Sequence, residues 1–261
     1  MIYPIDFESK VGFDSIRRNV SDKCQTRLGK DEVSQMAFSS DFIDVKNRLV
    51  LVDEMMRILG ENLPLPSGGV HDVIPYLSEI KAVGSFMTAD RLYKLSSTLS
   101  AMAEFETFFR KQVDEETRNA RFPALCAEFS EIANFPFLVA EIGRAVNKYG
   151  EIKDTASPEL YEIRQSIRAA AGSMQRAMKR VLENAISKGV VERDAAPSIR
   201  DGRMVIPVIA GNKYALNGII HDESATGKTV YIEPAEVVEA GNRMRQLEMD
   251  ERREIVAILI R

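Results

Sequence analysis

A Gly-Lys-Thr triplet at residues 227–229 matches the end of the P-loop that binds nucleotide phosphates. The complete motif requires a glycine five residues before Gly227 and a helix after the triplet, whose N-terminus faces the phosphates. The required glycine position is Asp222, which with Glu223 would place two negative charges beside the phosphates. The residues from Thr229 to Ile232 are β-branched or aromatic, which predicts a strand. The triplet therefore predicts a hairpin turn rather than a nucleotide site.

The remaining candidates for catalysis or metal binding are two histidines and two cysteines. His71 and His221 lie at no metal-ligand spacing from another histidine or cysteine, and no Gly-x-Ser-x-Gly nucleophile motif accompanies them. Cys24 and Cys126 belong to no Cys-x-x-Cys pair, which favours two reduced thiols over a disulfide or metal site. Carboxylates are plentiful but follow the surface patterns of helices. We therefore expect no catalytic residue, no metal and no cofactor in these residues.

The composition predicts a globular protein. Of 261 residues, 45% are hydrophobic and 28% charged, which is typical of one large domain or two modest ones. The net charge of −4 excludes a generally basic nucleic-acid-binding protein, so such a role requires a local basic surface. The N-terminal residues do not form a signal peptide and no apolar run reaches transmembrane length, which predicts a cytoplasmic protein without membrane contact.

Residues 1–150 have the spacing of a string of helices, which we expect to form a helical core domain. Three apolar stripes predict buried helix faces. Their members are Phe13, Ile16 and Val20; then Phe42, Val45, Leu49, Val52, Met56 and Leu59; and then Leu92, Leu95, Leu99, Met102, Phe105 and Phe109. A break rich in proline and glycine at 61–69 precedes the third stripe, and Thr88 is placed to cap its helix.

A long uninterrupted helix is predicted from Ser157, a capping residue followed by Pro158 at the first helical position. Apolar residues follow at alternating spacings of three and four, the seam of a coiled coil. They are Leu160, Ile163, Ile167, Ala170, Met174, Ala177 and Val181. About 30 residues would reach about 45 Å, longer than a compact domain needs. Basic residues between Arg164 and Arg180 outnumber nearby carboxylates, which indicates either a solvated face or a surface for an anionic partner.

Residues 190–234 change to the period-two pattern of strands. Asp201-Gly202 predicts a hairpin, followed by a strand from Arg203 to Val208. Two more strands are predicted at 216–220 and 228–232, and a second long helix from Pro234 onward. Two long helices joined by a small β-rich tip predict an arm in which the helices run antiparallel. The last residues, AILIR, carry several apolar side chains without a helix cap, from which we expect a longer protein.

Four segments resemble the MutS superfamily, specifically its second bacterial branch, the type-two MutS proteins. They are EIKDTASPELYEIRQSIR, SIRDGRMVIPV, GIIHDESATGKTVYIEP and VVEAGNRMRQLEMDERREI, and the resemblance spans essentially the whole chain. It implies a mainly α fold with a small β subdomain. The expected parts are a helical core domain over 1–150, an outgoing lever helix over 151–189, a β-rich tip or clamp over 190–234, and a return lever helix over 235–261.

The resemblance also implies a function. Proteins of this family are dimers that bind branched DNA, suppress homologous recombination and in some bacteria split collided ribosomes. The motifs of their ATPase domain, which binds ATP and Mg²⁺, and of their usual nuclease domain have no counterpart in these 261 residues. No catalytic residue is therefore carried over. The segment itself is expected not to be an enzyme, whereas full-length relatives would hydrolyse ATP and act as endonucleases.

Two functions remain for these residues. In the first, the tip contacts the phosphates of branched DNA or ribosomal RNA through lysine and arginine side chains. The candidate nucleic-acid-binding residues are Lys188, Arg193, Arg200, Arg203, Lys213 and Lys228. In the second, the seam of the arm recruits a partner helix for protein interaction or dimerisation, without nucleic-acid contact. Salt dependence distinguishes the two functions, because phosphate contacts weaken steeply with ionic strength.

Overall fold

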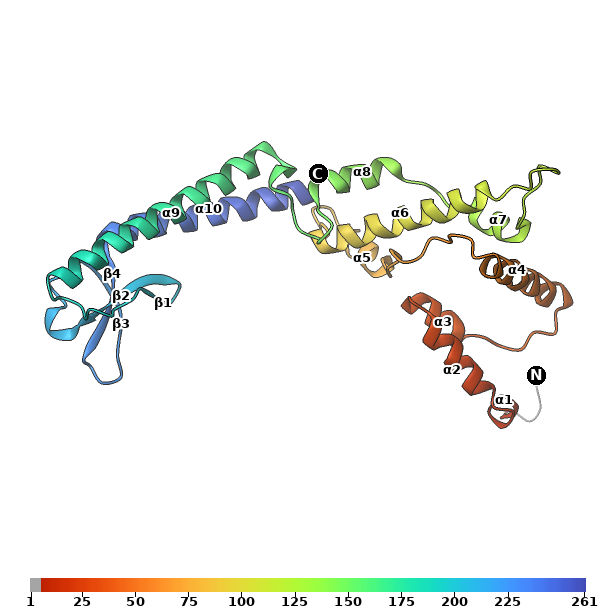
Figure 1. Cartoon of the computed structure of the whole chain (residues 1–261), viewed down its shortest axis with the longest axis horizontal. Coiled ribbons are helices and arrows are strands. Elements are labelled where there is room, and N and C mark those ends of the chain that lie inside the picture. The colour runs from red at the N-terminus through yellow and green to blue at the C-terminus, as the bar shows by residue number, and fades with distance from the viewer. Residues whose placement is uncertain (1–5) are drawn as a thin grey trace. The chain divides into compact units, whose positions relative to one another are not determined.

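The computed structural model describes residues 6–261, which fold into two compact units (Figure 1). One unit ends at Lys153 and the other comprises Asp154–Arg261. Helices dominate both units, and the strands that the structure describes form a four-stranded antiparallel sheet in the second. The predicted class, mainly α with a small β part, is confirmed.

The first unit is built from helices joined by loops. Within the described residues they are α1 (Phe7–Lys10), α2 (Phe13–Lys23), α3 (Arg27–Ser34), α4 (Phe42–Gly60), α5 (Ile74–Glu79), α6 (Ala89–Lys111), α7 (Pro123–Ser130) and α8 (Pro136–Ala145). Asp41 caps α4, because its carboxylate accepts hydrogen bonds from the N–H groups of Ile43 at 2.8 Å and Asp44 at 3.2 Å. Thr88 directly precedes α6, but its side chain makes no capping hydrogen bond. The stability of α6 therefore depends more on the burial of its apolar face than on Thr88.

An aromatic core lies between α4, α6 and α7. Phe109 and Phe122 are fully buried there beside Ile58. The ring of Phe109 stacks on that of Phe129, with the two centroids 4.5 Å apart. The predicted buried face of α6 is confirmed at Leu95 and Phe109, both of which are buried.

A buried carboxylate fixes the start of α7. Glu54 of α4 is 4% exposed, and its two oxygens accept hydrogen bonds from the N–H groups of Ala124 at 3.0 Å and Leu125 at 2.8 Å. These amides belong to the first turn of α7, where N–H groups have no partner within the helix and the helix dipole favours negative charge. One side chain of α4 therefore completes the hydrogen bonding of α7.

The predicted buried stripe of α4 is wrong. Its six apolar side chains are exposed, from Phe42 at 78% to Val45 at 38%. The face that packs on the aromatic core consists instead of Leu51, Glu54, Met55 and Ile58. Helix α4 has apolar side chains on two faces. The buried face also carries Glu54, so the sequence pattern alone does not indicate that this face is the buried one. The stripe of α2 is likewise exposed at Ile16 and Val20.

Along the chain of the second unit, the strands of the sheet lie between two long helices. Its elements are η1 (Asp154–Ala156), α9 (Pro158–Ser187), β1 (Ser198–Arg200), β2 (Arg203–Ile209), η2 (Ala210–Asn212), β3 (Gly218–Glu223), β4 (Thr229–Pro234) and α10 (Ala235–Ile260). The strand order is β1-β2-β4-β3, and every pair is antiparallel. Asp201 and Gly202, with φ of 48° and 71°, form the turn between β1 and β2. Positive φ at both turn residues suits a two-residue hairpin, as predicted.

Helices α9 and α10 lie side by side, with the sheet at one end of the pair (Figure 1). Ser157 caps α9 by accepting a hydrogen bond from the N–H of Leu160 at 3.0 Å, and its hydroxyl lies 2.7 Å from a carboxylate oxygen of Glu254. Nearer the sheet, Arg180 lies 3.9 Å from Glu236. Since residues early in α9 meet residues late in α10, the two helices run antiparallel.

The core of the second unit joins α9, the sheet and the start of α10. Met178 and Val181 of α9 are buried against Ile206 and Ile232 of the sheet and Val237 of α10. The apolar seam of α9 is therefore covered near the sheet by other elements of the same unit. This packing leaves that part of the seam unavailable to a partner helix.

Candidate nucleic-acid interface

Four of the six candidate residues gather where α9 and β2 end. The side chain of Asn212 donates a hydrogen bond to the backbone oxygen of Gly189, 3.2 Å away. Gly189 directly follows Lys188 at the end of α9, and Asn212 directly precedes Lys213. One hydrogen bond therefore joins the segments that carry these two lysines.

The start of β4 adds Lys228 to the same place. The N–H of Ala210, the first residue of η2, donates a hydrogen bond to the backbone oxygen of Lys228 at 2.9 Å. Lys228 also borders a cavity of about 610 Å³, whose walls include both neighbours of Arg193, the carboxylates Glu192 and Asp194. The four residues Lys188, Arg193, Lys213 and Lys228 are called the basic cluster below.

The charges of the basic cluster are available to an anion. Within residues 6–261, none of its four cations forms an ion pair with a carboxylate. Lys188, Arg193 and Lys228 are exposed, and Lys213 is half-buried with its Nζ 5.2 Å from the ring centroid of Tyr214. The two carboxylates that flank Arg193 reduce the net charge. Glu223 at the β3–β4 turn adds a third carboxylate near Lys228. Four cations against three carboxylates still leave a local positive excess on a chain whose net charge is −4.

The other two candidates, Arg200 and Arg203, serve contacts within the sheet. Nη1 of Arg203 lies 3.3 Å from a carboxylate oxygen of Glu233, whose side chain is 2% exposed. Arg200 stacks over Tyr231, with its guanidinium carbon 4.5 Å from the ring centroid, and its Nε lies 3.4 Å from Asp222. Arg203 begins the seven-residue strand β2, whereas the basic cluster gathers where this strand ends, about 20 Å away. The structure therefore separates two residues from the four that it brings together.

The Gly-Lys-Thr triplet lies at the turn between β3 and β4, which confirms the predicted hairpin. Gly227 has a φ of 65°, and its N–H donates to the backbone oxygen of Ser224 at 2.8 Å. The N–H of Thr229 donates to the hydroxyl of Ser224 at 3.1 Å. These amides are thus used within the turn, and a strand follows where a P-loop requires a helix.

Carboxylates from other elements pair with the basic residues in the first part of α9. Arg164 pairs with Asp154 of η1 at 2.6 Å and with Glu251 of α10 at 2.7 Å. Arg168 also pairs with Asp154. Hydrogen bonds from Arg168 and Arg164 hold the pKa of the Asp154 carboxyl below its ordinary value of 3.8. The excess charge in the first part of α9 is therefore matched by carboxylates elsewhere in the unit.

Within residues 6–261, no group of three or more His, Cys, Asp or Glu side chains is arranged to hold a metal ion. Among the same residues, no helix has the length and apolarity to cross a membrane.

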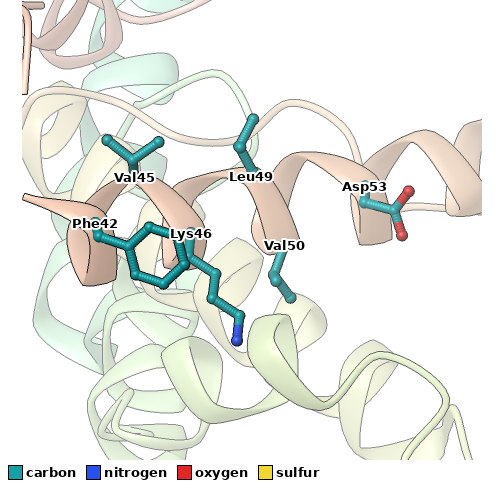
Figure 2. Close-up of a pocket in the computed structure, with 6 residues that line it drawn as sticks. All are labelled: Phe42, Val45, Lys46, Leu49, Val50 and Asp53. Carbon is teal, nitrogen blue, oxygen red and sulfur yellow. The ribbon is translucent and has the colours of Figure 1, made fainter.

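A hollow of about 340 Å³ lies on the exposed face of α4 (Figure 2). It is lined by Phe42, Val45, Lys46, Leu49, Val50 and Asp53, which all come from one helix. Its surface is mainly apolar, which suits protein contact better than chemistry.

One residue of the candidate interface is missed by the sequence analysis. Tyr214 follows the basic cluster residue Lys213 and is 88% exposed. An aromatic residue beside a lysine in the polar segment Gly211–Lys213 is a signal of a nucleic-acid contact, but it is a weak one without the three-dimensional neighbours.

Comparisons with known proteins place these features in a wider context. The chain is 31% identical over 249 residues to a protein named "Endonuclease MutS2" from Symbiobacterium thermophilum, a match covering 95% of this chain and 30% of the relative. It is 33% identical over 247 residues to the protein of the same name from Thermomicrobium roseum, with the same coverage. It is 30% identical to the one from Geobacillus sp., again over 95% of this chain and 31% of the relative. No protein-family model matches the chain. The chain is therefore a relative of proteins named endonuclease MutS2, and it spans about 30% of their length.

Proposed function

We propose that the basic cluster binds the phosphates of nucleic acid in a protein of the MutS type. The observation that carries this proposal is that four cations without ion pairs lie at one end of the second unit. Hydrogen bonds join the segments of Lys188, Lys213 and Lys228, and both neighbours of Arg193 line the cavity that Lys228 borders. Contacts of this kind give affinity that depends on salt and not on base sequence. The name of the relatives, endonuclease, supports a nucleic-acid ligand.

For the whole protein, we propose a cytoplasmic, ATP-driven dimer that acts on branched DNA or ribosomal RNA. The ATP and Mg²⁺ would be held outside residues 1–261, and the antiparallel pair of α9 and α10 would serve as the lever that carries the tip. Suppression of recombination and rescue of stalled ribosomes are the two roles that suit such ligands. In this scheme the described residues supply binding and positioning but no catalytic group.

The test is a titration of a DNA four-way junction and of a structured ribosomal RNA fragment at several salt concentrations. A variant with alanine at all four positions of the basic cluster is compared with wild type. Each lost phosphate contact lowers the slope of log affinity against log salt by about 0.9 on duplex DNA, so four contacts predict a change of roughly 3.6. The affinity lost between 50 and 200 mM salt then shrinks by roughly 100-fold in the variant.

A matched control changes the same charge elsewhere. Four lysines of the first unit are exposed and form no ion pair within the described residues: Lys23, Lys30, Lys46 and Lys81. Their replacement by alanine should leave the slope near that of wild type. An unchanged slope in the basic-cluster variant, or an equal loss in both variants, would show that the contacts lie elsewhere.

A second candidate function is protein interaction, which the apolar face of α4 favours. Large side chains there, including Phe42 and Leu49, are exposed over much of their surface. The seam of α9, in contrast, is covered near the sheet within its own unit. If α4 binds protein, Leu49→Glu should reduce self-association in sedimentation experiments without changing the salt slope of nucleic-acid binding. Unchanged self-association would remove the support for this second function.

A further inference from the structure

An exposed aromatic ring stands at the basic cluster with no role in the core. Tyr214 is 88% exposed, whereas Leu216, two residues later, packs against the core of the second unit. An exposed tyrosine ring does not give the fold the stabilisation that its burial would supply. Such a position is useful when the ring has a ligand of its own.

The loop that carries Tyr214 is held in place on both sides. The N–H of Ala215 donates to the backbone oxygen of Asn212 at 2.8 Å, which closes a tight turn around the tyrosine. Before the tyrosine, Asn212 is tied to Gly189 at the end of α9, and Ala210 to Lys228. After it, the backbone oxygen of Asn217 accepts a hydrogen bond from the N–H of Ala235 at 3.0 Å. The ring is therefore presented from a loop whose ends are fixed, which lowers the entropy lost when a ligand binds.

The charges around the ring select the kind of ligand. Lys213 approaches the ring within 5.2 Å, and the segments of Lys188 and Lys228 are tied to the same loop. A flat aromatic surface among several cations suits a nucleic-acid strand, whose bases have π faces and whose successive phosphates are anions. An apolar protein partner would instead require neighbouring apolar side chains and would leave these cations without partners.

A second exposed tyrosine shows what the arrangement at Tyr214 adds. Tyr149 in the first unit is 72% exposed, and the Nζ of Lys148 lies 5.1 Å from its ring centroid. Its turn also contains Glu151, which accepts a hydrogen bond from Asn147. The one lysine beside Tyr149 is thus balanced by one carboxylate, and this residue provides a matched control.

We infer that Tyr214 is a stacking platform for an unpaired nucleic-acid base, while Lys213, Lys228 and Lys188 bind the adjoining phosphates. The inference rests on the proposed function, and it specifies the ligand as a single-stranded or bulged segment of DNA or RNA. Stacking is tolerant of sequence, because every base has a π face. The site should therefore prefer unpaired over fully paired nucleic acid without reading a sequence.

Fluorescence gives a direct test, because the chain contains no tryptophan. Tyr214→Trp introduces a single fluorophore at the proposed platform, and Tyr149→Trp introduces one at the control position. Both proteins are titrated with a single-stranded DNA 12-mer, a single-stranded RNA 12-mer, and a fully paired duplex. Stacking should quench the fluorescence of Tyr214→Trp with either single strand, more strongly than with the duplex, and leave that of Tyr149→Trp unchanged. The DNA and RNA arms show which nucleic acid the platform favours.

Affinity measurements separate stacking from charge. Tyr214→Ala should weaken binding of the single strands by about 5- to 150-fold, the range for loss of one stacked base, and Tyr214→Phe should retain most of the affinity. The salt slope should stay near that of wild type in both variants, because no cation is removed. Tyr149→Ala should bind as wild type does.

The outcomes distinguish this inference from the function on which it rests. The basic-cluster variant could lose its salt slope while Tyr214→Ala binds normally and the fluorescence of Tyr214→Trp is not quenched. In that case the stacking platform is wrong and the phosphate contacts stand. If wild type binds no nucleic acid in a salt-dependent manner, the proposed function fails and the platform fails with it. Equal quenching of Tyr214→Trp and Tyr149→Trp would also overturn the inference, because it would show that the nucleic acid contacts both positions without a preference for Tyr214.

Discussion

The buried carboxylate of Glu54 offers a direct test of how the first unit is held together, because a single side chain supplies both acceptors for the start of α7. Glu54→Ala leaves the N–H groups of Ala124 and Leu125 without these acceptors. Leu125 is buried, so its amide takes the full cost of a buried unsatisfied group, about 1–3 kcal/mol. Ala124 is half-buried, so water replaces part of its lost bond.

Together these losses predict that Glu54→Ala lowers the free energy of unfolding of the first unit by about 2–4 kcal/mol. Glu54→Gln keeps one oxygen but turns an amide N–H toward a donor, so we expect an intermediate loss. The neighbouring residue gives a matched control. Asp53→Ala removes the same charge from an exposed position one residue away and should change the stability by less than about 0.5 kcal/mol.

Urea unfolding followed by circular dichroism gives the overall change, and hydrogen exchange measured by mass spectrometry assigns it to an element. The amides of α7 should lose protection in Glu54→Ala, whereas those of β2 and β4 in the second unit should not. Unchanged protection of α7, or an equal loss in Asp53→Ala, would refute the view that this carboxylate secures the helix.

Three further predictions concern the second unit. Gly218→Ala should disrupt the pairing of β3 with β4, because an added Cβ would lie 2.2 Å from a backbone oxygen of the facing strand. The disruption should appear as lost amide protection in hydrogen exchange. Gly211→Ala should be tolerated, because such a Cβ would have no neighbouring atom within 4 Å. Asp154 has a lowered pKa, so its contribution to stability is present above its ordinary value of 3.8 and is lost as the pH falls through the lower folded-state value. The destabilisation caused by Asp154→Asn should therefore be evident at neutral pH and vanish in strong acid, as measured by thermal unfolding across pH. Calorimetry with Mg-ATP should give no binding heat for the 261-residue chain, and Lys228→Ala should change nothing; micromolar binding abolished by this variant would revive a nucleotide site.

Local patterns in the sequence predict the elements of the second unit well, because their signals depend on neighbouring residues. The Asp201-Gly202 turn requires positive φ, and the β-branched and other apolar residues concentrated in β2 and β4 indicate strands. The cap at Ser157 is likewise local, since its hydroxyl bonds an amide three residues later.

Features that depend on distant residues could not be predicted. The buried face of α4 includes Glu54, which looks like a surface residue until the amides of α7 are placed beside it. The charge of Arg164 is matched by Glu251, a residue 87 positions away. The basic cluster depends on the hydrogen bond between Asn212 and Gly189, which no periodicity signals. For the same reason, the exposure of Tyr214 is visible only once the turn around it is closed.

The pairing of α9 with α10 has a mechanical consequence. Two helices joined along their length bend less than one, and the 30 residues of α9 extend for about 45 Å. A rotation of about 5° about the end near Asp154 would sweep the far end of such a beam through about 4 Å. That displacement is comparable to the spacing between neighbouring strands, and it is enough to make or break a contact between a lysine and a phosphate. Under the proposed function, the pair would convert a small angular change at one end into the gain or loss of a phosphate contact at the other.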